Sequence, residues 1–413
     1  MNLPANADAI ESLALGEIDV SNPELYATDS WRPYFARLRR DDPVHYIEDS
    51  AFGPFWSITR FEDIVAVDTN HQVFSSDKNI IIGDIGDDLP TENFIAMDPP
   101  KHDVQRRAVQ PVVAPQNLAQ LETVIRQRVC TILGGLPLGE RFDWVSQVSV
   151  NLTTQMLATL FNFPFEDRNK LTYWSDIAAG SPEISGGNVT PEERIAGLGE
   201  CLAYFTRLWH ERAGQDGGFD LISLLQRDPN THDMVDRPME YLGNLGLLIV
   251  GGNDTTRNSI TGGLLALNQN PAEYDKLRAN PGLIGSMVSE IIRWQTPLMH
   301  MRRTAKEDIE FKGKLIRKGD KVVMWYLSGN RDENAIQNAD SFIIDRKNPR
   351  HHLSFGFGIH RCMGNRLGEM QLRILWEEIM RRFSFVEVVE EPGRISSNFV
   401  RGYSSMPVVL HGL

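Results

Sequence analysis

One cysteine lies in a glycine-rich turn over residues 355–364, where the sequence reads Phe-Gly-Phe-Gly-Ile-His-Arg-Cys-Met-Gly. Residues 365–383, which follow directly, read as a helix. The N–H groups that begin this helix and the guanidinium of Arg361 both stabilise negative charge, so they favour a thiolate at Cys362. The stretch therefore predicts an anionic sulfur at the surface of a turn, and the rest of the chain must be arranged to use it.

A thiolate in a glycine-rich turn is suited to a metal-containing, flat ligand. Glycines let the backbone approach such a ligand closely. A haem iron held by a cysteine thiolate is a site where electron donation favours O–O cleavage. The alternative is a buried free cysteine, which is the ordinary state of a lone intracellular cysteine. On the residues of the turn alone, both interpretations stay open.

Length and composition narrow the class of protein. The 413 residues are 41% hydrophobic and no Ser/Gly/Pro-rich linker divides them, so we expect one domain over residues 1–413. A net charge of -13 argues against nucleic acid as a partner, because phosphate binding needs a basic face. Cys130, Cys201 and Cys362 are too widely spaced for a disulfide framework or a Cys-rich zinc site. No Lys or Arg precedes Arg32 and no apolar run approaches ~20 residues, so we expect a soluble, cytoplasmic protein without signal peptide or membrane anchor.

The local patterns predict a mainly helical chain with small β-sheets. Helices are expected over residues 31–40 and 61–68, with a hairpin between them formed by strands 44–47 and 55–59. Residues 118–225 read as mostly helical, with breaks near 163–164 and 181–191. The β-rich part is expected in residues 40–60 and 295–330 and at the C-terminus. Residues 80–90 read as an irregular apolar loop, and Asp98 is a plausible cap for the helix that carries His102 and Arg106.

A second unusual stretch lies within a helix predicted over residues 238–268. Gly251-Gly252-Asn253-Asp254-Thr255-Thr256 contains two glycines, each of which costs a helix about 1 kcal/mol relative to Ala. Absent side chains would leave room for a cofactor and a small gas molecule, and a local opening of the helix would free a carbonyl for water. Thr255 could then donate a hydrogen bond to dioxygen, with Asp254 supplying protons. The alternative is that Thr255 bonds to its own helix and Asp254 is a surface acid.

Together these motifs resemble those of the cytochrome P450 family. Phe-x-x-Gly-x-His-x-Cys-x-Gly is similar to the family's haem-binding loop, and Gly-Gly-x-Asp-Thr-Thr to its oxygen-activation motif. His-x-x-x-Arg, Glu-x-x-Arg and Phe-x-x-Asp-Arg also occur in the family's order along nearly the whole chain. The resemblance implies a triangular single-domain fold with haem b between the long central helix and the helix after the cysteine loop. It implies a monooxygenase that uses O₂ and two electrons, with Cys362 as iron ligand and with Asp254 and Thr255 as catalytic residues.

The resemblance also implies roles for further residues. His102, Arg106, Arg303 and His360 would bind the haem propionates, with Arg302 as the fallback for Arg303, and Phe355, Gly356 and Gly364 would shape the cofactor loop. Glu290 and Arg293, joined by Arg346, would form a buried ion cluster that braces the loop carrying Cys362. The family's mobile lid over the substrate channel would lie within residues 118–225. Its aromatic residues could face substrate, although aromatics at helical spacing are more often core; they are Phe161, Phe163, Phe165 and Trp174.

An electron donor must be a separate protein, because the chain contains no flavin or iron–sulfur region. We expect a [2Fe-2S] ferredoxin with its NAD(P)H-dependent reductase. An acidic ferredoxin would be attracted to a basic patch on an otherwise acidic protein. The candidate residues for that patch are Lys101, Arg107, Lys347, Arg350, Arg361 and Arg366.

A closer similarity of two segments to one branch of the family indicates the substrate. Residues 94–106 and 251–259 are similar to the bacterial alkane terminal-hydroxylase branch of the family, which implies a medium-chain n-alkane or fatty acid attacked at its terminal methyl. The candidate substrate-facing residues are Gly251, Val250, Leu298, Ile81, Ile82 and Val400. The alternatives are a hydroxylase of bulkier steroids or terpenes, which shares every catalytic motif, and a haem-thiolate sensor or peroxide-using enzyme, which would not need Asp254 and Thr255.

Overall fold

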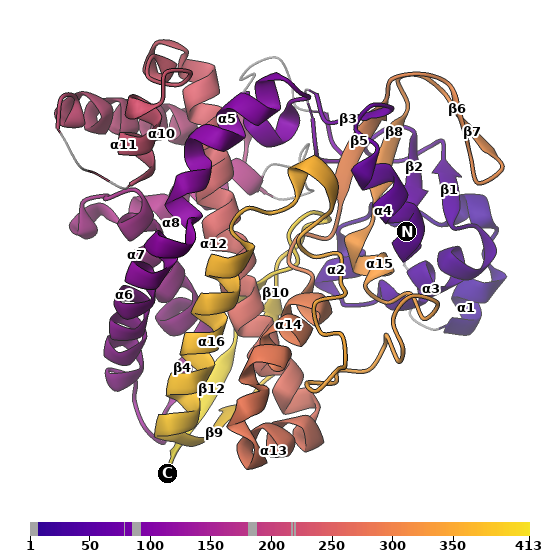
Figure 1. The fold of residues 1–413 in the computed structure, drawn as a ribbon. Coiled ribbons are helices and arrows are strands. Elements are labelled where there is room, and N and C mark those ends of the chain that lie inside the picture. The colour runs from indigo at the N-terminus through magenta and orange to yellow at the C-terminus, as the bar shows by residue number, and fades with distance from the viewer. Residues whose placement is uncertain (1–6, 78, 85–91, 181–187, 216–217, 219) are drawn as a thin grey trace.

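The computed structural model describes residues 7–77, 79–84, 92–180, 188–215, 218 and 220–413, and helices make up the larger part of it (Figure 1). The helices are α1 (Ala7–Ser12), α2 (Glu24–Ala27), α3 (Arg32–Asp41), α4 (Phe61–Thr69), α5 (Lys101–Val109), α6 (Pro115–Gly134), α7 (Asn151–Leu160), α8 (Asn169–Ala179), α10 (Pro191–Arg212), α11 (Leu221–Arg227), α12 (Pro238–Gln269), α13 (Pro271–Ala279), α14 (Ile284–Gln295), α15 (Tyr326–Gly329) and α16 (Asn365–Arg382). The predicted fold class, mainly α with small sheets, is confirmed.

The strands form four small sheets. They are β1 (Val44–Ile47), β2 (Phe55–Ile58), β3 (Phe74–Ser75), β4 (Arg141–Asp143), β5 (Met301–Ala305), β6 (Ile309–Phe311), β7 (Lys314–Ile316), β8 (Lys321–Met324), β9 (Phe383–Val388), β10 (Gly393–Arg394), β11 (Tyr403–Ser405) and β12 (Pro407–Gly412). The largest sheet has the order β1-β2-β8-β5-β3, in which only β2 and β8 are parallel. β4, β12 and β9 form a second sheet, and β6–β7 and β10–β11 are two-stranded ribbons.

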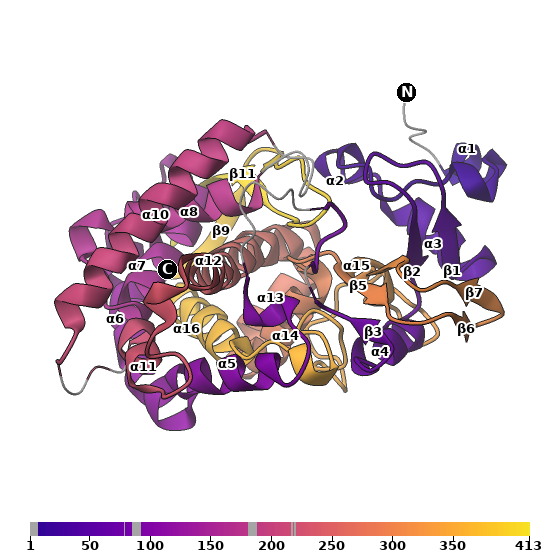
Figure 2. The ribbon, with the colours of Figure 1, turned by 90° about the horizontal axis from the view of Figure 1, so that it is seen from above.

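α12 crosses the helical part of the molecule, and α16 lies beside it in both views (Figures 1 and 2). α12 begins with Pro238, which suits a first helical turn because proline has no N–H to satisfy there. Its C-terminal half is buried almost all round, as expected for a helix with apolar or small residues on every face. Gly263 allows α14 to approach, since a Cβ there would lie 2.7 Å from Ile291 Cδ1. α6, α12, α14 and α16 share one hydrophobic core.

Several sequence predictions of local structure hold closely. The helix expected over 238–268 is α12, and the helix expected over 365–383 is α16. The helices expected over 31–40 and 61–68 are α3 and α4, and the predicted hairpin strands are β1 and β2, which pair antiparallel. Parts of two expected features lie outside the described residues: residues 85–90 of the apolar loop and residues 181–187 of the break at 181–191.

One local prediction is wrong, and one predicted helical segment also contains a short strand. Asp98 does not cap α5, whose N-cap is Pro100; its carboxylate instead accepts hydrogen bonds from Ser75 Oγ (2.7 Å) and the Ser76 N–H (3.0 Å). The segment 118–225 also contains the strand β4, which pairs with β12 near the C-terminus. A three-residue strand carries too little periodicity to be recognised, and its partner lies more than 250 residues away.

No helix among the described residues is long and apolar enough to cross a bilayer.

Candidate active site

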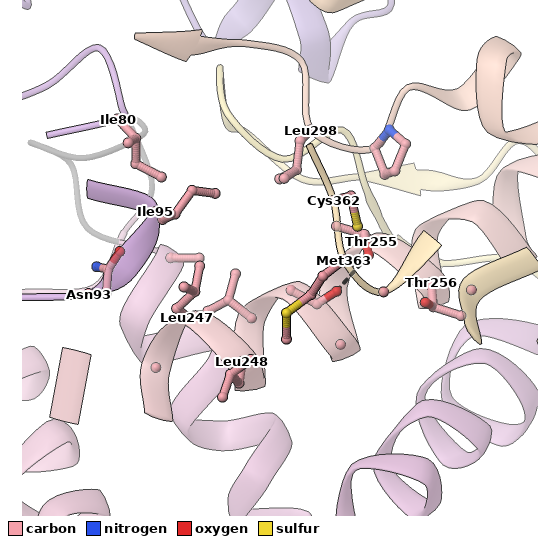
Figure 3. Close-up of a pocket in the computed structure, with 18 of the residues that line it drawn as sticks. Ile80, Asn93, Ile95, Leu247, Leu248, Thr255, Thr256, Leu298, Cys362 and Met363 are labelled. Carbon is pink, nitrogen blue, oxygen red and sulfur yellow. Dashed lines mark hydrogen bonds between the residues drawn. The ribbon is translucent and has the colours of Figure 1, made fainter. Parts of the chain in front are cut away.

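A cavity of about 360 Å³ lies between α12, the cysteine loop and the segment leading into β5. Its lining is mainly apolar. In Figure 3, Ile80 and Ile95 point into one side of it, whereas Leu298, Thr255 and Cys362 lie on the other. Among the described residues that line the cavity there is no Asp or Glu, and the formally ionised side chains are those of three arginines: Arg106, Arg194 and Arg303. The cavity therefore suits a large apolar group that carries negative charge at its edge.

Cys362 projects from a loop that is fixed by its own backbone. The Cys362 N–H donates to the Phe355 carbonyl (2.8 Å) and the Gly356 N–H to the Leu353 carbonyl (2.7 Å). Gly356 and Gly358 both adopt φ of +64°, a region that favours glycine. Phe355, Gly356, Cys362 and Gly364 all line the cavity. The loop thus presents the Cys362 sulfur to the cavity, next to the side chain of Met363 (Figure 3).

The prediction that the surroundings alone make Cys362 an anion is wrong in direction. Its side chain is open to the cavity, yet enough protein surrounds the sulfur that desolvation raises the pKa of the thiol. The Gly364 N–H and the charges of Arg106 and Arg361 lower that pKa but do not prevail. A bound cation would supply the missing stabilisation, because a coordinated thiol is deprotonated by its metal.

Two histidines present unmatched nitrogens beside the cavity. His102 and His360 are buried and their rings are 4.4 Å apart, centroid to centroid. Within the described part of the chain, His360 Nδ1 and Nε2 and His102 Nε2 have no hydrogen-bond partner. Burial, with nearby Arg303 and Arg106, lowers the pKa of His360 to about 2, and burial likewise lowers the pKa of His102. Both rings are therefore neutral at pH 7. His360 has an N–H to donate, whereas the one N–H of a neutral His102 is donated from Nδ1 to Asp103 Oδ1 at 2.7 Å.

Arg106 and Arg303 complete this edge of the cavity. Arg106 donates to the carbonyl of Arg361, which ties α5 to the cysteine loop. Arg303 lines the cavity, whereas the fallback residue Arg302 does not; it pairs with Asp84 at 2.6 Å. The structure thus brings together the four predicted cofactor-binding groups, although His102 lies behind His360 rather than in the lining.

Glu290, Arg293 and Arg346 form one buried ion cluster, as predicted from the resemblance. Glu290 Oε1 lies 2.7 Å from Arg293 Nη2, and Glu290 Oε2 lies 2.8 Å from Arg346 Nε. Arg293 also donates to the carbonyls of Asn330, Ala339 and Ser341. The Asn330 side chain in turn accepts from the Leu353 N–H and donates to Ser354 Oγ, and these residues lie two positions and one position before Phe355. The cluster is therefore linked to the start of the cysteine loop.

Gly251 and Gly252 of α12 have different neighbours. Gly251 lines the cavity with nothing within 4 Å of an added Cβ, whereas a Cβ on Gly252 would lie 2.8 Å from Leu157 of α7. α12 is continuous through this point, so the predicted local opening is not present. Thr255 lines the cavity and its hydroxyl donates to the Gly251 carbonyl at 2.8 Å, which is the alternative that the sequence left open.

Asp254 is not a surface acid. Its side chain is 2% exposed and points toward α8, where Ser175 Oγ donates to it at 3.2 Å. Arg257 bridges Asp254 (2.8 Å) and the half-exposed Asp176 (2.7 Å). Burial raises the pKa of Asp254 to about 6, against the opposing attraction of Arg257. The group can therefore exchange a proton near neutral pH, and Asp176 connects it to the surface.

These observations agree with three comparisons. The Cytochrome P450 family profile matches residues 282–404. Linalool 8-monooxygenase of Pseudomonas putida is 36% identical over 405 residues, covering 95% of this chain and 98% of that protein. The chain belongs to the cytochrome P450 family. The structure of CYP153D17 from a Sphingomonas species is 45% identical with a TM-score of 0.90, covering 96% of this chain and 100% of that one. Methyl-branched lipid omega-hydroxylase of Mycobacterium bovis is 31% identical over 95% of both chains.

Family membership implies a haem b whose iron is held by a cysteine, and the residues of this P450 fit that group. Cys362 is the one cysteine of three that lines the cavity. Gly251 leaves open space on α12, since nothing lies within 4 Å of an added Cβ there, and Gly364 adjoins the Cys362 sulfur. The unmatched His360 nitrogens and the two arginines at the cavity would supply donors to the haem carboxylates. Haem b supplies oxygen activation when bound.

The substrate side was predicted less well. Val250, Gly251, Leu298 and Ile81 line the cavity, but Ile82 and Val400 do not. Ile82 packs with Trp325 and Phe35 in a separate core, and Val400 pairs with Leu298 in an isolated bridge while its own side chain joins the core behind it. Sequence reasoning missed several lining residues, which lie far apart in the chain and carry no motif: Asn93, Ile95, Leu160, Ala178, Leu198, Leu247, Leu248 and Phe399. Of the four lid-region aromatics, Phe161, Phe163 and Trp174 are core and Phe165 is exposed.

Proposed function

This P450 is a haem-thiolate monooxygenase; we propose that it hydroxylates a medium-chain linear alkane or fatty acid at the terminal methyl. The observation that carries the proposal is the apolar cavity that extends from Cys362 and Thr255 to Ile80 and Ile95 (Figure 3). A chain lying along it would place its end near Thr255 on α12. A relative that is 31% identical is named a methyl-branched lipid omega-hydroxylase, and this supports attack at a chain end.

Cys362 is proposed as the iron ligand, with His360, His102, Arg106 and Arg303 receiving the propionates. The N–H of the neutral His360 and the two guanidinium groups are strong donors to carboxylates, and His360 is already desolvated, so little reorganisation is required. His102 donates from Nδ1 to Asp103, so it can donate from Nε2 to a propionate only when it is protonated on both nitrogens. Phe355, Gly356 and Gly364 shape the loop around the sulfur. The cluster of Glu290, Arg293 and Arg346 is proposed to brace that loop through Asn330.

Asp254 and Thr255 are proposed to deliver protons. The Thr255 hydroxyl lies at the cavity, where it donates to the Gly251 carbonyl. The hydroxyl can rotate away from that carbonyl and donate instead to an acceptor that binds in the cavity. Asp254 does not line the cavity, so a proton must pass from it around α12 through water or a side-chain rotation. Arg257 and Asp176 join Asp254 to solvent. A carboxyl that titrates near pH 6 suits a proton carrier at neutral pH.

A [2Fe-2S] ferredoxin, reduced by an NAD(P)H-dependent reductase, is proposed as electron donor. All six predicted basic residues are exposed. Two of them pair with acids, since Lys101 lies 2.5 Å from Glu92 and Arg350 lies 2.8 Å from Glu369. The other four are Arg107, Lys347, Arg361 and Arg366. The patch is therefore weaker than the sequence suggested, and we expect steering by those four residues.

A terpenoid is the second candidate substrate, because the 36%-identical relative is a linalool 8-monooxygenase. The cavity lining is equally compatible with a compact apolar substrate. The two candidates differ in polarity as well as shape. Arg194, which lines the cavity from α10, gives a fatty-acid carboxylate a cation and offers nothing specific to a terpene.

Product analysis tests the proposal. The purified haem-loaded protein would be supplied with a surrogate ferredoxin, its reductase and NADH, and offered n-octane, dodecanoic acid and linalool in competition. Mainly 1-octanol or 12-hydroxydodecanoic acid is the expected result, and Arg194→Leu should reduce use of the acid more than that of octane. Products from linalool alone would move the assignment to the terpenoid candidate. Turnover with peroxide but none with the ferredoxin and O₂ would contradict the monooxygenase mechanism.

A further inference from the structure

Asp68, near the end of α4, has no role in the motifs above, yet its carboxylate lies at the junction of the haem-side elements. Its Oδ1 accepts from Arg303 Nη2 at 2.7 Å. Its Oδ2 accepts from Tyr326 Oη and from the Phe357 N–H, each at 2.8 Å. The side chain is 1% exposed. One carboxylate therefore connects α4, β5, α15 and the cysteine loop.

We propose that Asp68 is a positioning residue for the haem: it holds Arg303 at the propionate edge, fixes the backbone of the cysteine loop, and balances the charge of that arginine. The proposal rests on the proposed role of Arg303 as a propionate ligand. It does not depend on which substrate or electron donor the enzyme uses.

The cavity supports this role over that of an ordinary buried ion pair. Arg303, Tyr326 and Gly356 all line the cavity, so three groups in contact with or next to the Asp68 carboxylate face the place of the cofactor. A guanidinium has five N–H donors. Arg303 uses one toward Asp68 and one toward the Arg302 carbonyl, which leaves donors for the cavity.

The loop glycines fit against the same residue. A Cβ on Gly358 would lie 2.6 Å from the Asp68 carbonyl oxygen, and a Cβ on Gly356 would lie 3.3 Å from its Oδ2. Both glycines also adopt φ of +64°. The turn that carries Cys362 therefore packs directly against Asp68, so a displacement of Asp68 must also displace the loop.

The negative charge of Asp68 should have a measurable effect on the reduction potential of the haem. Arg303 is 2% exposed, so solvent screens its charge poorly and Asp68 is its nearest counter-charge. Replacing the carboxylate by an amide of the same shape removes one negative charge from the surroundings of the haem. A more positive surrounding favours the ferrous over the ferric state, because reduction adds an electron. The reduction potential should therefore rise when Asp68 is neutralised.

The test compares Asp68→Asn with Asp63→Asn in the haem-loaded protein. Asp63 is also a buried carboxylate on α4, but it pairs with Lys312 (3.0 Å) and does not line the cavity. Dye-coupled potentiometry should give a positive shift for Asp68→Asn and none for Asp63→Asn. Haem transfer to apomyoglobin should be several-fold faster from Asp68→Asn alone. Equal potentials for Asp68→Asn and the parent protein would overturn the proposal.

The double variant Asp68→Asn/Arg303→Gln establishes whether Asp68 acts through Arg303. Against an Arg303→Gln background, Asp68→Asn should accelerate haem transfer to apomyoglobin little; an equally large acceleration there would overturn the proposal. If Asp68→Asn alone does not fold, the double variant should restore folding, because it removes the uncompensated buried cation. Failure of the double variant to fold as well would overturn the charge argument. Arg303→Gln alone tests its propionate role, so failure of that part of the proposed function is recognised separately.

Discussion

Asp254→Asn should make the folded protein more stable at neutral pH while it slows turnover. The carboxyl is 1% exposed, and burial raises its pKa from the usual 3.8 to about 6. A carboxyl whose pKa is raised by folding binds its proton more tightly in the native than in the unfolded protein. The free energy of unfolding must therefore fall as pH rises from about 4 to about 6, and it stays at the lower value above that window.

The magnitude follows from the two pKa values. At 1.36 kcal/mol for each pKa unit, the rise from 3.8 to about 6 costs about 3 kcal/mol once the carboxyl is fully ionised. Near pH 5 only about half of that cost, roughly 1.6 kcal/mol, is present. Asparagine has no such cost at any pH. The stability advantage of Asp254→Asn should therefore grow by about 1.4 kcal/mol between pH 5 and pH 8.

Urea unfolding of the haem-loaded proteins, followed by the Soret band and by far-UV circular dichroism, measures this difference. Lost hydrogen bonds or packing would shift the variant equally at both pH values, so only the growth with pH is diagnostic. Asp176→Asn is the matched control, because the Asp176 charge raises the pKa of Asp254; this variant should reduce the pH dependence without abolishing it. A constant stability difference from pH 5 to pH 8 would refute the reasoning. Turnover of Asp254→Asn should fall by about 10² or more if the carboxyl carries protons.

The remaining predictions concern the brace and the docking patch. Glu290→Ala or Arg293→Ala should yield protein without stable haem, because breaking a buried ion pair costs about 3–5 kcal/mol. Normal haem content in either purified variant would contradict the bracing role. Arg141→Ala, which removes an exposed pair with Glu390, is the control. Reversing Arg107 and Arg366 together to Glu should slow reduction by ferredoxin and flatten its dependence on salt, whereas reversing the distant, exposed Lys318 should change neither; stopped-flow reduction over a range of ionic strength measures both.

The sequence by itself determined the elements and the chemistry. A 32-residue helix with Pro238 at its start and a helix directly after the Cys362 turn follow from local pattern, because caps, prolines and periodicity act within a few residues. The motif order also identified the family, and with it the cofactor. The residues of the haem-side edge were named from motifs and are found together: His102, Arg106, Arg303 and His360.

Only the tertiary structure decided how these groups are charged and what lies behind them. Cys362 was expected to be anionic from its helix and Arg361, but desolvation by the packed loop outweighs both. Asp254 had two opposite interpretations until its burial against α8 and its pairing with Arg257 were known. Ile82 and Val400 are apolar like the true lining, and nothing local distinguishes a residue facing a cavity from one facing the core. Asp68 carries no motif; its importance arises from contacts with residues more than 230 positions away, and such long-range contacts are set by packing alone.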